Sequence, residues 1–207
     1  MRVLVLAPMP LELEAIVTAF GLTRAALSRV FDATRPDHTP FDHVMIAGIC
    51  GGLDPDLPVG TLVNPDTVID HTSGATYAHT PPGAAPTAGT LITTEGVSLD
   101  KDQSLRFFED GCIAVDMETS AVAEVCEANG CPWSVYRCIS DRHFDGLLDE
   151  RVINLANPDG SGNREAFEQL LAEDPSILPK LEQLGRDSEL AARLAAEAAV
   201  RGCLALT

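Results

Sequence analysis

The chain has few basic residues. It contains 14 Lys and Arg against 31 Asp and Glu in 207 residues, which gives a formal net charge of -17 and a pI near 4.4. Nucleic acids and anionic membrane surfaces would repel such a chain unless a local basic patch offset the charge, and the sequence has no such patch. We therefore expect neither a nucleic-acid partner nor a membrane partner.

Paired cysteines and long apolar runs are also lacking. No two cysteines have the C-x-x-C spacing, and several lie in apolar stretches where a thiol packs as a small hydrophobe, which argues against a zinc site, a disulfide framework or a cofactor held by thiolates. The cysteines are Cys50, Cys112, Cys126, Cys131, Cys138 and Cys203. The first apolar run, residues 3–6, meets Pro8 and Pro10 and is too short for a signal peptide or a membrane span. We expect a cytoplasmic protein without a metal or cofactor.

Segments with the patterns of strands and helices alternate along the chain, which favours an α/β fold. A length of 207 residues suits one domain whose core buries about 70% of the unfolded surface, and no internal repeat or interdomain linker is found. Apolar runs predict strands at 3–6, 43–47, 61–69, 90–94 and 133–139. Helical spacing predicts helices at 11–20, 24–31, 117–128, 164–172 and 177–184, and a last helix capped by Asp187 or Ser188.

Acidic residues stand at both ends of the predicted helix and strand between residues 113 and 141. Val115-Asp116-Met117-Glu118-Thr119 begins the helix, and Arg137-Cys138-Ile139-Ser140-Asp141 ends the strand. In open α/β sheets ligands collect beyond the carboxyl ends of strands, so Asp141 is placed for chemistry. The alternative is that Asp141 only turns the chain after the strand, because Asp is a common turn residue.

Two further motifs follow predicted strands. Met9-Pro10-Leu11-Glu12 comes after the first strand, and Gly48-Ile49-Cys50-Gly51-Gly52-Leu53 comes after the strand at 43–47, where it predicts a tight turn. Glu12 and Glu118 also fit an ordinary preference for acidic residues in the first turn of a helix. Met117 fits plain core packing. Both interpretations stay open for these residues.

Together and in this order, the three motifs resemble the nucleoside phosphorylase and nucleosidase superfamily, and in particular its methylthioadenosine/S-adenosylhomocysteine nucleosidases. The resemblance implies a three-layer α/β/α fold around a central mixed sheet, and an assembly of at least two chains. Between the Glu12 helix and Gly48 the chain has about half the residues expected for that family. We therefore predict a shortened N-terminal half.

The resemblance also implies roles for individual residues. Asp141 would donate a proton to the purine, Glu12 would activate water, and Met117 and Glu118 would hold the ribose. The remaining residues implied to bind substrate are Asp116, Ile49, Cys50, Gly51, Val97 and Ser98. An acid at the base and an anion at the sugar are what cleavage of an N-glycosidic bond requires, because negative charge develops on the base and positive charge on the sugar.

The chain departs from the family pattern at the glycine motif and at the base wall. Ile49 replaces a serine there and no arginine precedes it, although phosphorylases need cationic and hydroxyl donors for a phosphate dianion. Residues 95–98 form a smaller, more polar wall than the family places against the purine. Water is therefore favoured over phosphate as the nucleophile, and the identity of the base stays open.

Other polar residues near the motifs carry less weight. Arg142 and His143 follow Asp141 and are interpreted as solvated or paired with acidic neighbours such as Asp145 and Asp149. His71 and His79 flank a loop at 73–89 and could approach a substrate, while Glu95 is interpreted as a solvent-facing loop residue.

These observations favour an enzyme that hydrolyses the N-glycosidic bond of a purine nucleoside or 5'-thionucleoside, with the nucleoside as its small-molecule partner. A phosphate-dependent phosphorylase and a degenerate protein that binds a nucleoside without turnover are the alternatives. Retention of Glu12, Glu118 and Asp141 favours the enzyme.

Overall fold

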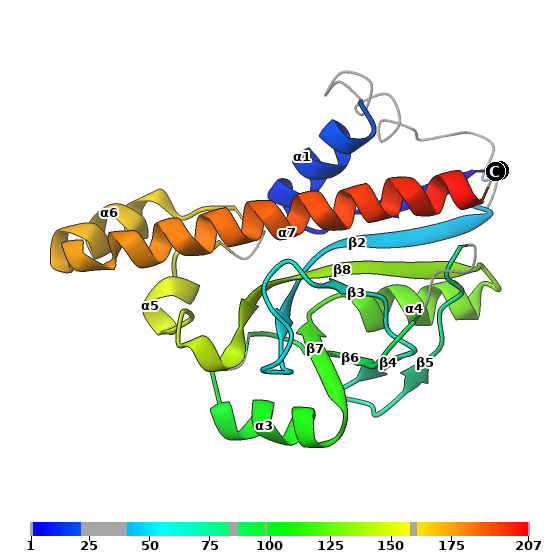
Figure 1. Cartoon of the computed structure of the whole chain (residues 1–207), viewed down its shortest axis with the longest axis horizontal. Helices are drawn as coiled ribbons and strands as arrows, with labels where there is room; N and C mark the ends of the chain where they lie inside the picture. The colour runs from blue at the N-terminus through cyan, green and yellow to red at the C-terminus, as the bar shows by residue number, and fades with distance from the viewer. Residues whose placement is uncertain (1, 22–40, 83–86, 98, 158–160, 207) are drawn as a thin grey trace.

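A mixed sheet with helices on both faces forms the centre of the computed structural model, which describes residues 2–21, 41–82, 87–97, 99–157 and 161–206 (Figure 1). The strands are β1 Val3–Leu6, β2 His43–Gly52, β3 Leu62–Val63, β4 Thr67–Asp70, β5 Thr76–Tyr77, β6 Thr90–Thr93, β7 Cys112–Asp116 and β8 Trp133–Arg142. The helices are α1 Pro10–Ala19, α3 Lys101–Glu109, α4 Thr119–Ala128, α5 Glu150–Ile153, α6 Arg164–Glu173 and α7 Leu178–Ala205, with 3-10 turns η1 His143–Asp145 and η2 Pro175–Ile177.

The long strand β2 organises the sheet. The strand order is β3-β8-β2-β7-β6-β4-β5, and β8 runs parallel to β2 along most of its length. The first half of β2 pairs in parallel with β1, whereas Gly51 and Gly52 at its end pair with antiparallel β7. The pairing register with β8 shifts between Cys50 and Gly51. This change of partners brings β7 and β8 together at the carboxyl end of β2.

Alternate residues of β2 face two separate helix layers. Met45 and Ala47 pack against alanines of α7 and residues of α1, while Val44 and Ile46 pack in the core that α4 covers. This two-residue alternation is the normal consequence of strand geometry, and because both faces are covered the strand is apolar from Val44 to Ala47. Figure 1 shows α1 and α7 on one side of the sheet and α4 on the other, which confirms the predicted three-layer fold.

The predicted single strand at 61–69 is wrong. Residues 62–63 form β3 beside β8, whereas residues 67–70 form β4 beside β6, so the two pieces belong to different parts of the sheet. Pro65 lies between them and has no N–H with which to continue a ladder. The predicted loop at 73–89 contains the short strand β5, and α3 was not predicted at all. The predicted helix at 24–31 and the predicted shortening lie outside the described residues.

The predicted break near residue 187 is also wrong, because α7 continues without interruption through 28 residues. Asp187 does not cap a helix; it accepts hydrogen bonds of 2.8 Å from the Gln183 amide one turn earlier. The exposed Gly185 does not stop the helix. The helix packs through small side chains, chiefly alanines between residues 191 and 199, and Gly202 leaves room for the Tyr136 ring.

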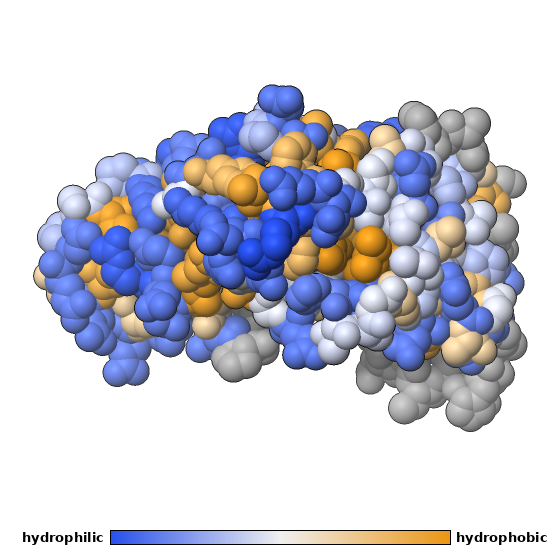
Figure 2. Space-filling model, turned by 90° about the horizontal axis from the view of Figure 1, so that it is seen from below, coloured by the Kyte–Doolittle hydropathy of each residue, from blue (hydrophilic) through white to orange (hydrophobic). Residues whose placement is uncertain are grey.

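Hydrophilic residues cover most of the face shown in Figure 2, with hydrophobic residues in patches between them. Among the described residues, the buried Asp, Glu, Lys and Arg side chains are few: Glu12, Asp116 and Arg137. Within the described part of the chain, we find no helix whose length and hydrophobicity would let it cross a bilayer.

Asp149 fixes the segment that follows β8. Its carboxylate accepts the N–H groups of Arg151 and Val152 at 3.0 and 3.1 Å and so caps α5. The same group pairs with Arg151 Nη2 at 2.9 Å and with Lys180 Nζ of α7 at 3.0 Å. The hydrogen bond from Arg151 holds the pKa of Asp149 well below its usual range, against the opposing effect of burial and with help from Lys180.

We expect Asp149→Ala to lower the free energy of unfolding by about 1 kcal/mol at pH 7, the usual loss when a helix cap is removed. Because the Asp149 side chain is 34% exposed, its ion pairs add little to this figure. Since the folded-state pKa is depressed, the stabilisation is present at neutral pH and disappears as pH falls through that pKa. Urea denaturation measures the loss, and Asp149→Asn, which keeps a cap, is the control. Equal stability of Asp149→Ala and wild type would contradict this assignment.

Candidate active site

A cavity of about 240 Å³ lies where the carboxyl-terminal parts of β2, β7 and β8 meet. Its wall contains all the predicted site residues that fall in the described part of the chain: Glu12, Ile49, Cys50, Gly51, Val97, Asp116, Met117, Glu118 and Asp141. Ser98 lies outside the described residues. Thr94, Ser140, His143 and Leu148 also line the cavity and were not predicted as site residues. The strand-end argument therefore places residues from distant parts of the sequence around one space.

Arg137 lies behind the charged side of the cavity wall, where it pairs with three of the carboxylates that line it, and its role was missed from the sequence. Its side chain is completely buried in the middle of β8. Nη2 lies 2.6 Å from Asp116 Oδ2 and 2.7 Å from Glu118 Oε2, and Nη1 lies 3.4 Å from Glu12 Oε1. Burial disfavours the charged guanidinium, but the three carboxylates outweigh burial and raise the pKa of Arg137. The signal in the sequence was a charged residue inside an otherwise apolar strand, which is rare unless the charge is paired.

Gly48 makes the approach of Glu12 to Arg137 possible. Gly48 pairs with Arg137 across β2 and β8. A Cβ at this position would collide with Glu12 Oε1 and would come within 2.6 Å of Arg137 Nη1. The predicted tight turn at this glycine is wrong, because β2 continues through residues 48–52. Here glycine provides space for a neighbouring carboxylate inside a strand, not a turn conformation.

Glu12 is held by the start of its own helix and by β2. Its Oε2 accepts the N–H of Met9 at 2.8 Å, and its Oε1 accepts the N–H of Ile49 at 2.8 Å. The bond from Met9 is the capping interaction expected of a first-turn Glu, while the contact with Ile49 crosses to the sheet. Burial raises the pKa of Glu12, and the charge of Arg137 and the two N–H groups oppose that rise. The first-turn interpretation of Glu12 therefore describes a real contact, and activation of water by Glu12 stays a prediction.

Asp116 is enclosed by hydrogen-bond donors. Its Oδ1 accepts the Thr93 hydroxyl at 2.7 Å, and its Oδ2 accepts Arg137 Nε at 2.9 Å and the Thr119 N–H at 3.2 Å. The Thr119 hydroxyl also donates to Oδ2. Asp116 thereby caps α4, which begins at Thr119 and not at residue 117 as predicted. Glu118 consequently precedes the helix, and its side chain pairs with Arg137 and not with the helix N–H groups.

Asp141 also lines the cavity, but it is not one of the three carboxylates that pair with Arg137. It lies within the last residues of β8, because the strand runs to Arg142, and not just beyond a strand as predicted. Its Oδ1 accepts the Ser140 hydroxyl at 2.6 Å. Burial raises the pKa of Asp141, the Ser140 hydrogen bond works against the rise, and the charges of Asp145 and Asp187 add to it. These influences favour a carboxyl that holds its proton at higher pH than an ordinary aspartic acid.

The remaining polar candidates lie in different environments, and only His143 lines the cavity. Arg142 pairs with Asp145 at 2.8 Å, as the sequence interpretation expects. His143 does not follow that interpretation, because it lines the cavity, and burial and the charge of Lys101 lower its pKa. Glu95 is exposed and accepts a hydrogen bond from Thr72.

Three further residues have the character of packing groups. His79 is buried, with Nε2 2.6 Å from the Pro65 carbonyl oxygen, and His71 stacks edge-on against Phe107. Neither histidine is among the residues of the cavity wall. Burial raises the pKa of the Cys50 thiol well above its usual value, so Cys50 lines the cavity as a protonated apolar group.

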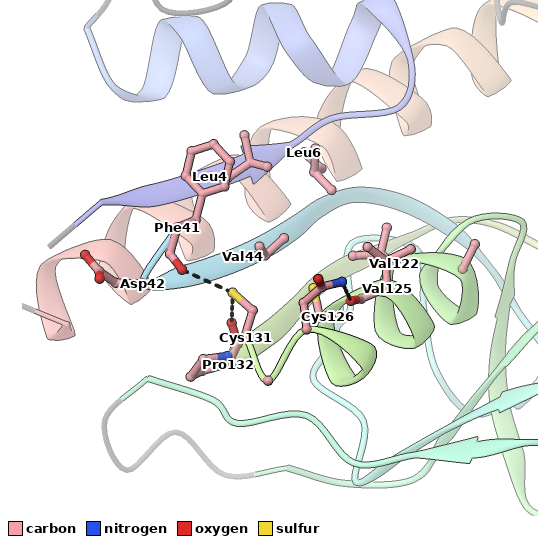
Figure 3. Close-up of a pocket in the computed structure, with 13 residues that line it drawn as sticks. Leu4, Leu6, Phe41, Asp42, Val44, Val122, Val125, Cys126, Cys131 and Pro132 are labelled. Carbon is pink, nitrogen blue, oxygen red and sulfur yellow. Dashed lines mark hydrogen bonds between the residues drawn. The ribbon is translucent and has the colours of Figure 1, made fainter. Parts of the chain in front are cut away.

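A larger hollow of about 770 Å³ lies away from this chemistry, between β1 and α4 (Figure 3). Its wall is apolar, with Leu4 and Leu6 from β1 facing Val122 and Val125 from α4. Asp42 is the one ionisable carboxyl or amine among its lining residues in the described part of the chain. Within those residues, no group of three or more His, Cys, Asp or Glu side chains is arranged to hold a metal ion. The smaller, acidic cavity is therefore the candidate active site.

Known proteins with similar sequences and folds carry related names. The family model described as the phosphorylase superfamily matches residues 25–88 and 82–173. A futalosine hydrolase of Streptomyces coelicolor is 30% identical over 158 residues, covering 62% of this chain and 66% of that protein. A 5'-methylthioadenosine/S-adenosylhomocysteine nucleosidase of Tolumonas auensis is 26% identical over 158 residues, covering 62% and 68%. The matched part thus spans about two thirds of each relative.

Solved structures show the same fold at low sequence identity. The Helicobacter pylori 5'-methylthioadenosine/S-adenosylhomocysteine nucleosidase superposes with a TM-score of 0.66 and 15% identity, covering 98% of this chain and 97% of that one. The Arabidopsis thaliana 5'-methylthioadenosine nucleosidase gives a TM-score of 0.61 and 14% identity, with coverage of 98% and 94%.

Proposed function

Because the chain belongs to the phosphorylase superfamily, we propose that it hydrolyses the N-glycosidic bond of a purine nucleoside or 5'-thionucleoside, releasing free base and sugar. The names of the two sequence relatives, a futalosine hydrolase and a nucleosidase, support hydrolysis as the reaction. The resemblance of the three motifs to the nucleosidases points the same way.

The observation that carries the proposal is the charge of the cavity wall. Four carboxyl groups line it, those of Glu12, Asp116, Glu118 and Asp141. The nearby guanidinium of Arg137 is enclosed by three of these groups. Such a wall repels a phosphate dianion and stabilises a positively charged sugar, which favours water as the nucleophile.

The carboxyl groups suit the separate steps of the reaction. As the bond between the sugar C1' and the base breaks, its electron pair moves to the base, and Asp141 donates a proton there. Glu12 accepts a proton from the water that attacks C1', so the products are the free base and the free sugar. The raised pKa of Asp141 helps it to hold the proton that it must donate.

The ribose would lie between these two groups, beside Met117 and Glu118. Glu118 Oε2 is fixed by Arg137, and the side chain remains 39% exposed, so it is available to the ribose hydroxyls. Met117 is 44% exposed and offers a flexible apolar surface to the sugar. Ile49, Cys50, Gly51 and Val97 would complete the walls around the substrate.

We expect the rate of base release to be independent of added phosphate, because the described wall offers no unpaired guanidinium to bind it. The test is a panel of purine nucleosides and 5'-thionucleosides, assayed for free base with and without phosphate. A rate that rises in proportion to phosphate, with a sugar 1-phosphate as product, would make the protein a phosphorylase. Binding of a nucleoside without release of base would make it a degenerate member.

Several finer properties are part of this proposal. We propose that the base is a purine, that the protein acts in the cytoplasm as a homodimer, that the chain forms one domain, and that neither nucleic acid nor membrane is its partner. The acidic excess of 31 carboxylates over 14 basic side chains supports the last of these.

A further inference from the structure

We propose that Asp116 is a positioning residue, which orients Arg137 and through it Glu118 without contacting the substrate. The proposal concerns the side of the cavity where the ribose would lie. The identity of that ligand rests on the proposed function, whereas the contacts between Asp116, Arg137 and Glu118 do not. It differs from the role that the sequence resemblance implies for Asp116, which is direct binding of substrate.

The hydrogen bonds of Asp116 argue against direct binding. Its two carboxylate oxygens accept from Thr93, from the N–H and hydroxyl of Thr119, and from Arg137. These donors come from two strands, β6 and β8, and from the start of α4, and they surround Asp116 at the end of β7. A carboxylate accepts about four hydrogen bonds, so this one is satisfied by the protein.

The geometry of Arg137 explains how Asp116 can act on Glu118. Asp116 Oδ2 contacts both Nε and Nη2 of the guanidinium, at 2.9 and 2.6 Å, which fixes the rotation of that planar group. The same Nη2 donates to Glu118 Oε2 at 2.7 Å. Glu118 has no side-chain hydrogen bond to the start of α4 that would hold it in another way. The position of the Glu118 carboxylate in the cavity therefore depends on the arginine that Asp116 orients.

The first test measures the orientation of Arg137 without any substrate. The Nε–H of a buried, hydrogen-bonded arginine exchanges slowly with water, so it gives an observable NMR resonance. We expect Asp116→Asn to shift this resonance and to speed its exchange by about 10-fold or more, since one carboxylate partner of the Nε–H is lost. Asp70→Asn is the matched control, because Asp70 accepts from Ser120 of α4 but not from Arg137. An unchanged Arg137 resonance in Asp116→Asn would overturn the proposal.

The second test is a double-mutant cycle between Asp116→Asn and Glu118→Gln, using the nucleoside that wild type hydrolyses fastest. We expect Asp116→Asn to raise KM by about 10-fold, the loss typical of removing a group that orients a binding side chain. In the Glu118→Gln background, Asp116→Asn should raise KM further by less than twofold, because both substitutions remove the same contact. Inhibition by the free base should be the same in Asp116→Asn as in wild type, since the base does not reach Glu118.

Each outcome of the cycle decides something different. The proposal would be wrong if the two substitutions had additive effects on KM, because Asp116 would then act independently of Glu118. It would also be wrong if Asp116→Asn weakened inhibition by the free base as much as it raises KM. If wild type releases no base from any nucleoside, the proposed function fails, and the NMR comparison alone decides the positioning role. Should Asp116→Asn not fold, Thr93→Val replaces it in both tests. It removes one donor to Asp116 and the acceptor of the Ser120 N–H, but no charge.

Discussion

Asp141→Asn is expected to lower kcat by about 10²-fold or more, the usual contribution of a general acid. The amide keeps the shape of the side chain and can still contact Ser140, but it has no acidic proton to give to the leaving base. Binding of the nucleoside should change little, because the substitution alters the transition state more than the ground state. The measurements are kcat from base release and the dissociation constant from equilibrium binding.

The pH dependence of kcat provides a second readout of the same change. Asp141 must be protonated to act, and its pKa is raised by burial, so kcat should fall as pH rises through that raised pKa. Asp141→Asn should lose this alkaline limb. Asp145→Asn should move the limb to lower pH, because the charge of Asp145 contributes to the raised pKa. Asp56→Asn, at an exposed turn away from the cavity, is the matched control. Unchanged turnover in Asp141→Asn would defeat the role assigned to this residue.

The sequence predicted the parts of the site that depend on the order of elements along the chain. Glu12, Glu118 and Asp141 each stand near the end of an apolar run. The runs that became β2 and β8 are recognisable because both faces of those strands are buried over most of their length, whereas β1 is half-buried. The rule that ligands collect at strand ends then brings these residues to one edge of the sheet.

Arg137 and Gly48 could not be interpreted in the same way. Their significance comes from pairing across neighbouring strands, which places a guanidinium beside a position without a side chain and admits Glu12 between them. Nothing in the periodicity of either segment specifies that register. For the same reason the glycine motif predicts a turn although it lies in a strand. The local sequence shows only that a side chain is absent at Gly48, whereas the structure shows that Glu12 and Arg137 occupy its space.

The other elements that the sequence predicts wrongly have related physical causes. Local signals divided the C-terminal helix near Gly185 and Asp187, but packing of its alanine face on the sheet holds the helix together beyond that point. The opposite error concerns Pro65. The apolar composition of residues 61–69 predicts one strand, but Pro65 has no N–H to continue a ladder, and the structure has two short strands there.

Arg137→Met is expected to lower the free energy of unfolding by about 3–5 kcal/mol at pH 7, the range observed when one partner of a buried ion pair is removed. Methionine fills much of the same space, so the loss comes chiefly from charge and hydrogen bonding. Without the guanidinium, the carboxylates of Glu12 and Asp116 remain buried with one cationic partner fewer. Denaturation with urea, followed by circular dichroism, measures the change.

The pH dependence of this loss separates charge from packing. Arg137 lowers the pKa of Glu12 against the effect of burial, so its removal lets the folded-state pKa rise further above the ordinary 4.5. The folded variant then binds a proton more readily than the unfolded chain does, and its stability should increase as pH falls from 7 toward that ordinary value. Arg142→Met is the matched control, because the Arg142–Asp145 pair is about one third exposed and should contribute little to stability. Equal losses in the two variants, or a loss for Arg137→Met that is independent of pH, would show that the carboxylates of Glu12 and Asp116 do not depend on Arg137 for their burial.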